Sequence, residues 1–263
     1  MAEVSYRESH KYEGKGAEYE QYYRTGAWQR FLWSREQEII LKILEKYFAG
    51  KDVHLLDFAC GTGRIAALLE DRVKTSTAVD VSVSMLAIAR QKLERTEIVE
   101  ADITAGNILK PRTFNFITAF RFFLNAEPEL RRAAIGALVE LLDEEGYLVF
   151  NNHQSLGSPW TKLLDVRHRQ KNPEGIFNVM SIEEMKELAW GAGLEILEVF
   201  PVGFFHPPKI PVSYRLNRAI DNLASRLKCL NRFSESPIAV CRRRKNHRVD
   251  SSPDKEMTDG VDR

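Results

Sequence analysis

Two closely spaced glycines, Gly61 and Gly63, follow a short apolar segment that contains Asp57. A glycine has no Cβ, so it can adopt positive φ and let a ligand come close to the backbone. The helix expected directly afterwards would point unpaired N–H groups and a partial positive charge at this turn. The stretch therefore predicts a nucleotide-binding turn at the carboxyl end of a buried strand.

Two classes of ligand use such a turn. The spacing Gly61-x-Gly63-x-x-Ala66 formally fits the dinucleotide fingerprint with its permitted final alanine. In that fingerprint the glycines lie against a pyrophosphate, which the carboxylate of Asp57 would repel. The same carboxylate is costly to desolvate without a partner, and it would favour a sulfonium–ammonium ligand. The glycines alone leave both ligand classes open.

Two further acids favour a ligand that contains adenosine. Asp80 ends the next apolar segment, and an acid at this distance from the glycines commonly accepts hydrogen bonds from a ribose diol. It could instead cap the following helix. Asp102 ends a third apolar segment, so all three acids would face one crevice at the carboxyl edge of a parallel sheet. Because unpaired acids are costly to bury, a purely structural role for all three is disfavoured.

The segment 57–63, with the sequence Asp-Phe-Ala-Cys-Gly-Thr-Gly, resembles the first motif of class I S-adenosylmethionine (SAM)-dependent methyltransferases. The resemblance implies SAM as the cofactor, bound at the turn around Gly61 and Gly63. It also implies contacts from the ends of the following strands: the ribose with Asp80, the adenine with Met85, Asp102 and Ile103, and the methionyl arm with Phe120. An ordinary core methionine would look the same as Met85 in sequence.

The acceptor side is expected after the fourth and fifth strands. The segment 118–125 lacks the Asn/Asp-Pro-Pro-Phe/Tyr sequence in which base-methylating enzymes resemble one another, which argues against a nucleic-acid substrate. Arg121 could hold an acidic substrate group or pair with a nearby acid. Histidine is the side chain best suited to remove a proton near neutral pH. We therefore predict His153 as the general base, with Asn151 or Asn152 orienting the acceptor; the alternative is a structural histidine.

The elements that position these residues alternate along the chain. Short apolar runs and helical patterns follow one another from 53 to 151, which predicts βαβ units and a parallel sheet. The resemblance implies a doubly wound α/β fold with a seven-stranded, mostly parallel sheet of order 3-2-1-4-5-7-6, strand seven being antiparallel. We expect the strands at 53–58, 75–80, 97–101, 115–120, 146–151, 194–202 and 237–242, and helices at 27–48, 63–71, 83–94, 128–142, 181–190 and 213–232. The last helix is predicted to be amphipathic, with an apolar side formed by Leu216, Ile220, Leu223 and Leu227.

The remaining segments complete the predicted organisation. Residues 1–50 form an N-terminal helical segment whose aromatic side chains either pack on the domain or close over the ligand as a lid. The methyltransferase domain spans 51–242 and carries a helical insert at 203–233. Residues 152–180 contain several glycines and prolines and are predicted to form a long, functional loop with one helical turn around 160–166. The polar segment 243–263 is predicted to be a disordered tail.

Composition limits the classes of partner. The chain has 263 residues, 44% of them hydrophobic and 29% charged, which is ordinary for a soluble globular protein. Its net charge of +1 gives no general electrostatic reason to expect a nucleic acid or an anionic membrane surface as partner. No apolar run approaches the roughly 20 residues that span a bilayer, and the polar N-terminus lacks a signal-peptide core. Three scattered cysteines suit a reducing cytosol, so we expect a cytoplasmic protein.

The six histidines show no metal-like spacing, so no metal is expected. Together these features predict a SAM-dependent methyltransferase that acts on a small molecule at an O, N or C atom. Two alternatives from other classes stay open, an NAD(P)-binding oxidoreductase and a SAM-binding protein without catalysis. The sequence does not predict the oligomeric state.

Overall fold

The computed structural model describes residues 13–171, 179–205 and 212–245. Its centre is one seven-stranded sheet with the order β3-β2-β1-β4-β5-β7-β6, which confirms the predicted order. β7 runs antiparallel to both β5 and β6, also as predicted. The strands are β1 (His54–Phe58), β2 (Thr75–Asp80), β3 (Thr96–Glu100), β4 (Phe114–Ala119), β5 (Leu142–Asn151), β6 (Leu194–Phe200) and β7 (Ile238–Arg243).

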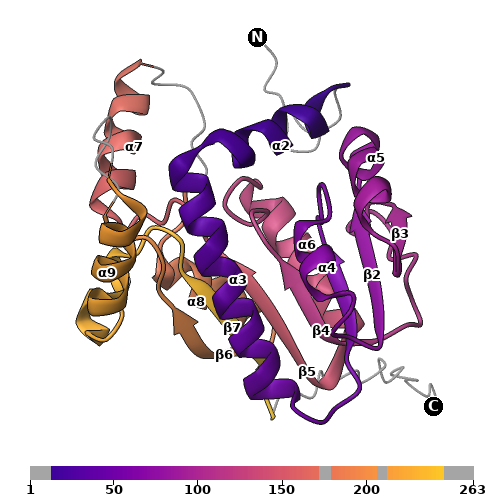
Figure 1. The fold of residues 1–263 in the computed structure, drawn as a ribbon. Coiled ribbons are helices and arrows are strands. Elements are labelled where there is room, and N and C mark those ends of the chain that lie inside the picture. The colour runs from indigo at the N-terminus through magenta and orange to yellow at the C-terminus, as the bar shows by residue number, and fades with distance from the viewer. Residues whose placement is uncertain (1–12, 172–178, 206–211, 246–263) are drawn as a thin grey trace, which may run out of the picture.

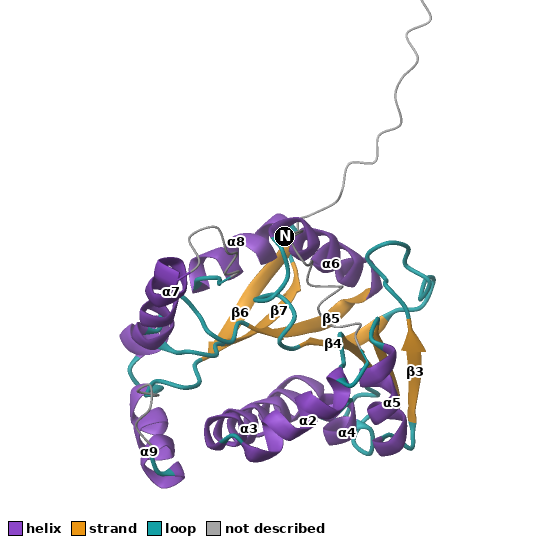
Figure 2. Cartoon of the chain, turned by 90° about the horizontal axis from the view of Figure 1, so that it is seen from above, coloured by secondary structure: helices purple, strands orange, loops and turns teal. Residues whose placement is uncertain are grey.

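Helices cover both faces of the sheet, as a view along the sheet shows (Figure 2). One face carries α3 (Ala27–Phe48), α4 (Arg64–Leu69) and α5 (Val83–Lys92), with α2 (Lys15–Thr25) lying over them. The other face carries α6 (Pro128–Leu141) and α8 (Ile182–Gly191). The last two α-helices, α7 (Pro159–Lys171) and α9 (Tyr214–Ala224), lie at the β6 end of the molecule, and a 3-10 helix (Lys228–Phe233) leads into β7 (Figure 1).

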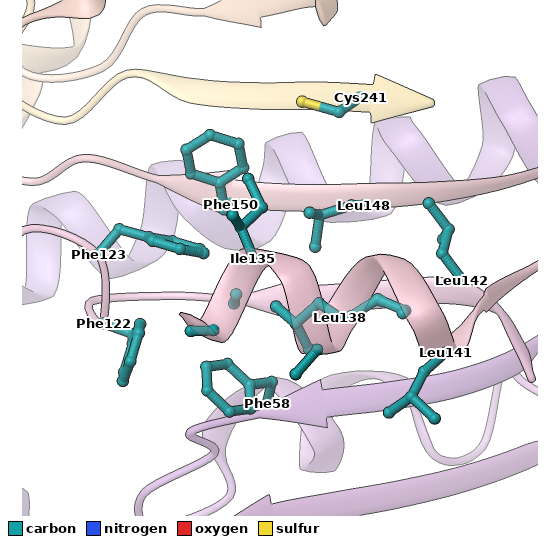
Figure 3. Packing of buried hydrophobic residues seen from close by; sticks show 14 of the residues in the cluster. Phe58, Phe122, Phe123, Ile135, Leu138, Leu141, Leu142, Leu148, Phe150 and Cys241 are labelled. Carbon is teal, nitrogen blue, oxygen red and sulfur yellow. The ribbon is translucent and has the colours of Figure 1, made fainter. Parts of the chain in front are cut away.

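The larger apolar core fills the space between α6 and the sheet (Figure 3). Helix α6 places Leu138 and Leu141, three residues apart on one face, against β4 and β5. Two aromatic pairs extend this core toward the carboxyl ends of the strands. Phe58 contacts Phe122 with ring centroids 4.8 Å apart, and Phe123 contacts Phe150 at 5.0 Å. These contacts fix the loop that follows β4.

Helix α3 forms the second core layer, and its observed bounds agree with the predicted 27–48. Its side chains Phe31, Ile40 and Ile43 are buried against the opposite face of the sheet. The two aromatic rings of Phe48 and Phe116 lie 4.8 Å apart and join the end of α3 to β4. Helix α3 is therefore packed into the core of the domain.

Three local predictions differ from the structure. The predicted long loop at 152–180 contains α7, because Pro159 occupies the start of that helix, where a proline fits without loss of a hydrogen bond. The predicted helix at 213–232 ends at Ala224 and is followed by the separate 3-10 helix. Arg243, predicted to begin the tail, is the last residue of β7. The rest of the predicted tail beyond residue 245 lies outside the described residues.

A buried carboxyl group joins α3 to the segment before β7 and makes stability depend on pH. The indole Nε1 of Trp28 donates to Oε1 of Glu235 at 3.2 Å, and burial raises the pKa of Glu235 to about 7. Because the folded-state pKa lies above the unfolded value of about 4.3, the stability that this group contributes is complete below pH 4 and is lost as the pH rises to about 7.

We expect Glu235→Gln to raise the free energy of unfolding at pH 8 by about 2 kcal/mol and to leave it nearly unchanged at pH 4. Denaturant unfolding at both pH values measures the effect. Glu129→Gln, at an exposed position, is the matched control and should behave as the wild type. Parallel pH dependence in wild type and Glu235→Gln would contradict the role given to this carboxyl group.

Candidate functional site

The turn after β1 has a backbone shape that only a few residue types accept readily. Ala59, Gly61 and Gly63 have φ values of 51°, 56° and 74°. A Cβ at Gly63 would lie 2.9 Å from Cδ1 of Leu93, so close packing requires glycine there. At Gly61 the same space is open, with only Sδ of Met85 within 4 Å, at 3.9 Å. Gly61 is thus the point at which a ligand can touch the backbone.

Asp57 lies behind this turn and does not line the cavity in front of it. Its Oδ1 accepts a hydrogen bond from Oγ1 of Thr118 at 2.8 Å, and its Oδ2 accepts one from the backbone N–H of Ala66 at 3.2 Å. Burial raises the pKa of Asp57 to about 7, which the two hydrogen bonds only partly offset. The carboxyl group therefore connects β1, β4 and the start of α4, and it supports the turn from below.

The other two acids lie at the cavity itself. Asp80, at the end of β2, accepts hydrogen bonds from the backbone N–H groups of Gly61 and Ser82, each at 2.8 Å. Asp102 follows β3 and accepts from the backbone N–H and the hydroxyl of Thr104, at 2.9 and 2.6 Å. Both carboxylates are thus held in place by the protein while they line the same space.

The cavity and its open mouth together enclose about 840 Å³ of space between atoms, part of which is open solvent. Six of the nine predicted site residues line it: Gly61, Asp80, Met85, Asp102, Phe120 and His153. The other three, Asp57, Gly63 and Ile103, lie behind the lining. Ile103 is buried in the core that α6 covers. The structure thus brings the predicted residues to one edge of the sheet, in an inner and an outer layer.

Helix α2 covers the cavity. The prediction for residues 1–50 included a helical segment that closes over the ligand, but it did not place this helix, because residues 1–24 show no clean period. Tyr19 and Tyr23 from this helix line the cavity. Oε1 of Glu20 accepts from Oγ1 of Thr62 at 2.5 Å, which joins α2 to the glycine turn. A Cβ at Gly16 would lie 2.4 Å from the carbonyl oxygen of Ser84, so α2 and α5 touch there. The four-residue spacing of Tyr19 and Tyr23 is the signal that could have indicated the helix.

Arg121 follows β4 with a positive φ of 62° and pairs with an acid of α3. Its Nη2 donates to both carboxylate oxygens of Glu36, at 2.9 and 3.0 Å, and its Nη1 donates to the hydroxyl of Tyr23. Burial lowers the pKa of Arg121, but Glu36 and the neighbouring tyrosines raise it by more. The net effect is a raised pKa, so the guanidinium stays charged. Glu36 was also missed; it lies in the same stripe as Leu32 and Ile40, where a buried acid signals a partner.

His153 follows β5 and lines the cavity near Arg121. Burial and the positive charges of Arg121 and Arg64 hold its pKa well below the usual value, so the imidazole is neutral. Its buried Nδ1 has no hydrogen-bond partner among the described residues, and the same is true of Nε of Arg121. Two polar atoms therefore remain to be satisfied beside the cavity.

The prediction that Asn151 or Asn152 orients the acceptor does not match their positions. Both side chains are fully buried and neither lines the cavity. Oδ1 of Asn151 accepts from the backbone N–H of Arg121 at 2.7 Å, and Nδ2 of Asn152 donates to the carbonyl oxygen of Met180 at 2.5 Å. A polar side chain at a strand end needs a partner once buried, and here protein groups bind Asn151 and the Nδ2 group of Asn152. Asn151 thereby fixes the backbone that presents Arg121.

The described ranges contain no group of three or more His, Cys, Asp or Glu side chains arranged to hold a metal ion. Within the same ranges, no helix has both the length and the apolar character that crossing a membrane requires.

Comparison with known proteins gives a family match over most of the fold. Residues 29–199 match the family model described as a methyltransferase domain. This range runs from α3 to β6, so it includes β1 to β5 and every strand end that contributes to the cavity. Helix α2 and α9 lie outside it.

Individual relatives are more distant. A putative methyltransferase of Geobacillus sp. (strain WCH70) is 32% identical over 135 residues, which cover 49% of this chain and 51% of that protein. The chain thus spans about half the length of this relative. A demethylmenaquinone methyltransferase of Leptospira interrogans is 26% identical over 196 residues, 71% of this chain and 74% of that protein. The structure of magnesium protoporphyrin IX methyltransferase from Synechocystis PCC 6803, with bound SAH, has a TM-score of 0.60 at 13% identity and covers 88% and 96% of the two chains.

Proposed function

The chain belongs to the methyltransferase-domain family, and from this premise we propose that it transfers the methyl group of SAM to a small-molecule acceptor. The observation that carries the proposal is the convergence of Gly61, Asp80, Asp102 and His153 on one cavity at the carboxyl ends of the strands. In open α/β sheets this edge is where ligands bind. The SAH bound to the Synechocystis structure is the product that SAM leaves in such a transfer.

The residues present fit SAM in polarity and shape. Asp80 would accept hydrogen bonds from the ribose hydroxyls, and Asp102 would accept from the adenine amino group, since both carboxylates line the cavity. Met85 and Phe120 would supply apolar contact area on either side. The open space at Gly61 would admit the methionyl part close to the backbone. Asp57, behind the turn, would add negative charge near a cationic ligand without touching it.

SAM supplies an electrophilic methyl group on a positively charged sulfur. In the transfer the sulfur–methyl bond breaks as a bond forms between the methyl carbon and the acceptor atom, and the electron pair of the broken bond stays on sulfur. The protein positions the acceptor in line with that bond and excludes water, both of which the covering helix α2 favours. His153 would take the proton that the acceptor atom loses.

The unsatisfied atoms beside the cavity indicate a polar acceptor. Nε of Arg121 can only donate a hydrogen bond, so it would bind an oxygen of the acceptor molecule. Neutral His153 can accept one at Nδ1, so it would bind a hydroxyl or amine that is to be methylated. We infer an acceptor that carries an N–H or O–H group beside a second oxygen.

All three cysteines are free, which favours a reducing, cytoplasmic setting.

Binding and turnover separate this proposal from its two alternatives. We expect calorimetry to show binding of SAM and SAH and no binding of NAD or NADP, because Asp57 lies behind the turn where a pyrophosphate would sit. Binding of a nicotinamide cofactor without SAM would favour an oxidoreductase.

An acceptor panel then tests catalysis by following SAH formation. It includes demethylmenaquinone and small hydroxy or amino compounds, with boiled enzyme as the control. SAM binding with no turnover on any acceptor would favour a SAM-binding protein without catalysis.

A further inference from the structure

Helix α9 presents its apolar side to solvent, the reverse of what the sequence pattern predicts. Leu216, Leu223 and Leu227 repeat at helical spacing, yet they are 52%, 65% and 49% exposed. The residues of α9 that are buried are Asn217, Asp221 and Ala224. Single exposed leucines are common, but Leu216 and Leu223 on α9, with Leu227 just beyond its end, form an exposed apolar group of the kind that marks an interaction surface.

Polar contacts hold α9 in this orientation. Both carboxylate oxygens of buried Asp221 accept from the backbone N–H of Gly203, at 3.1 and 3.2 Å, and Oδ2 lies 3.6 Å from Nε of Arg35 in α3. Arg218 donates to Oε1 of Glu38 at 2.5 Å, and the hydroxyls of Tyr214 and Ser34 are 2.7 Å apart. A rotation that buried the leucines would break these contacts and take the Asp221 carboxylate away from the N–H group of Gly203 and from Arg35. The outward stripe is therefore fixed by the fold.

Positive charges flank the leucine stripe. Arg215 in α9 and Arg226, just beyond the end of this helix, are both exposed and lie next to Leu216 and Leu227 in the sequence. Lys228 and Arg232 in the 3-10 helix are also exposed. Asp221 is the only acidic residue between Tyr214 and Phe233, and it is buried. Although the whole chain has a net charge of only +1, this surface is strongly basic.

We propose that the exposed face of α9 and the following 3-10 helix binds the surface of an anionic lipid bilayer. A helix with an apolar row and neighbouring cations lies in the interface of such a bilayer, its leucines among the acyl chains and its cations at the headgroups. Helix α7, which lies at the same end of the molecule (Figures 1 and 2), also has exposed apolar side chains, Leu163, Leu164 and Val166. The proposal departs from the expectation of no membrane partner, which rested on the overall charge and on the lack of an apolar run long enough to span a bilayer.

Charge favours a bilayer over a second copy of the chain. A twofold dimer through this face would bring two rows of arginine and lysine together. Such like charges repel, whereas anionic headgroups would neutralise them. The surface also lies apart from the residues that line the cavity, so SAM binding does not depend on it.

Co-sedimentation of the full chain with vesicles tests the proposal. We expect wild type to bind vesicles of phosphatidylcholine with phosphatidylglycerol, and to bind phosphatidylcholine alone much more weakly. The double variant Leu216→Ser/Leu223→Ser should lose about tenfold or more in affinity for the mixed vesicles. Arg215→Gln and Arg226→Gln should each lose about fivefold, and raised salt should have the same effect on wild type.

Ile108→Ser is the matched control, because Ile108 is a similarly exposed apolar residue, 64% accessible, outside this surface. It should bind as wild type does, and all variants should keep wild-type melting temperatures and SAM affinity. Three results would overturn the proposal: wild type that binds neither kind of vesicle, a leucine variant that binds as well as wild type, or a wild-type dimer by light scattering that the leucine variant converts to a monomer. A failure here leaves SAM binding intact and so differs from a failure of the proposed function.

Discussion

Asp80→Ala is expected to weaken SAM binding about a hundredfold or more while the protein stays folded. A hydrogen bond to a charged group contributes about 1.5 to 3 kcal/mol, and the proposed ribose contact has two of them. The same substitution removes the acceptor for the backbone N–H groups of Gly61 and Ser82, so the turn also loses a constraint. Both effects lower affinity, and a factor of ten corresponds to about 1.4 kcal/mol. Calorimetric titration with SAM and with SAH measures the loss.

Two companion variants show whether the effect belongs to the ligand. Asp80→Asn keeps one oxygen acceptor without the charge, so its affinity should fall between those of wild type and Asp80→Ala. Asp71→Ala removes an exposed acid whose described partner is Arg95, and it should bind SAM as wild type does. Thermal melting monitors the fold in each case. Equal SAM affinity in wild type and Asp80→Ala would remove this carboxylate from the proposed cofactor site.

The residues proposed to bind SAM could be predicted from the sequence because they lie at the ends of successive strands. Asp57, Asp80 and Asp102 lie at or just after the ends of three strands that are neighbours in the sheet, so their meeting follows from topology alone. The pattern did not predict which of these acids would line the cavity and which would lie behind it. Asp57 finds its partners in Thr118 and Ala66, which are distant in sequence, so nothing local indicated that it would lie behind the turn.

The acceptor side was largely hidden for the same physical reason. Arg121 was noticed, but its partner Glu36 lies 85 residues earlier in the chain and Tyr23 lies 98 residues earlier. Helix α2 has too few apolar residues to show a period, and it packs through glycine contact and polar bonds instead. Contacts of that kind depend on tertiary structure, which single-sequence patterns do not encode.

For helix α9 the amphipathic pattern was predicted correctly, but the side expected to face the protein was wrong. The repeat of Leu216, Leu223 and Leu227 did indicate an amphipathic helix, and one formed at 214–224. Periodicity reports that two faces differ, but it does not report which one meets the protein. Here Asp221 and its partners decided the matter, and the partners come from another segment.

His153→Ala is expected to slow methyl transfer about 100- to 10,000-fold, the usual contribution of a general base, with SAM affinity within about twofold of wild type. The imidazole lines the cavity just after β5, and under the proposed function it would contact the acceptor rather than SAM. Single-turnover measurements of SAH formation separate the chemical step from binding and product release. The size of the effect depends on an acceptor atom that must lose a proton.

His153→Gln distinguishes a base from a structural hydrogen-bonding group. Glutamine can fill the site and form hydrogen bonds, but it cannot take a proton near neutral pH, so we expect it to be as slow as alanine. Added imidazole should restore part of the rate of His153→Ala. Full activity in the glutamine variant would instead mean that His153 only fills and polarises the cavity wall.

The pH dependence gives an independent test of the same role. Burial and the nearby cations hold the pKa of His153 well below its usual value. The neutral, proton-accepting form therefore predominates at pH 6 as well as at pH 8, and kcat should not fall between these values through protonation of this group. A low pKa also makes the imidazole a weak base. It can take the proton only as the methyl bond forms and the acceptor becomes more acidic, so transfer of the proton accompanies or follows transfer of the methyl group. A loss of kcat with an apparent pKa near 6.5 that disappears in His153→Gln would show that the imidazole is exposed and ordinary, and would contradict this order of events.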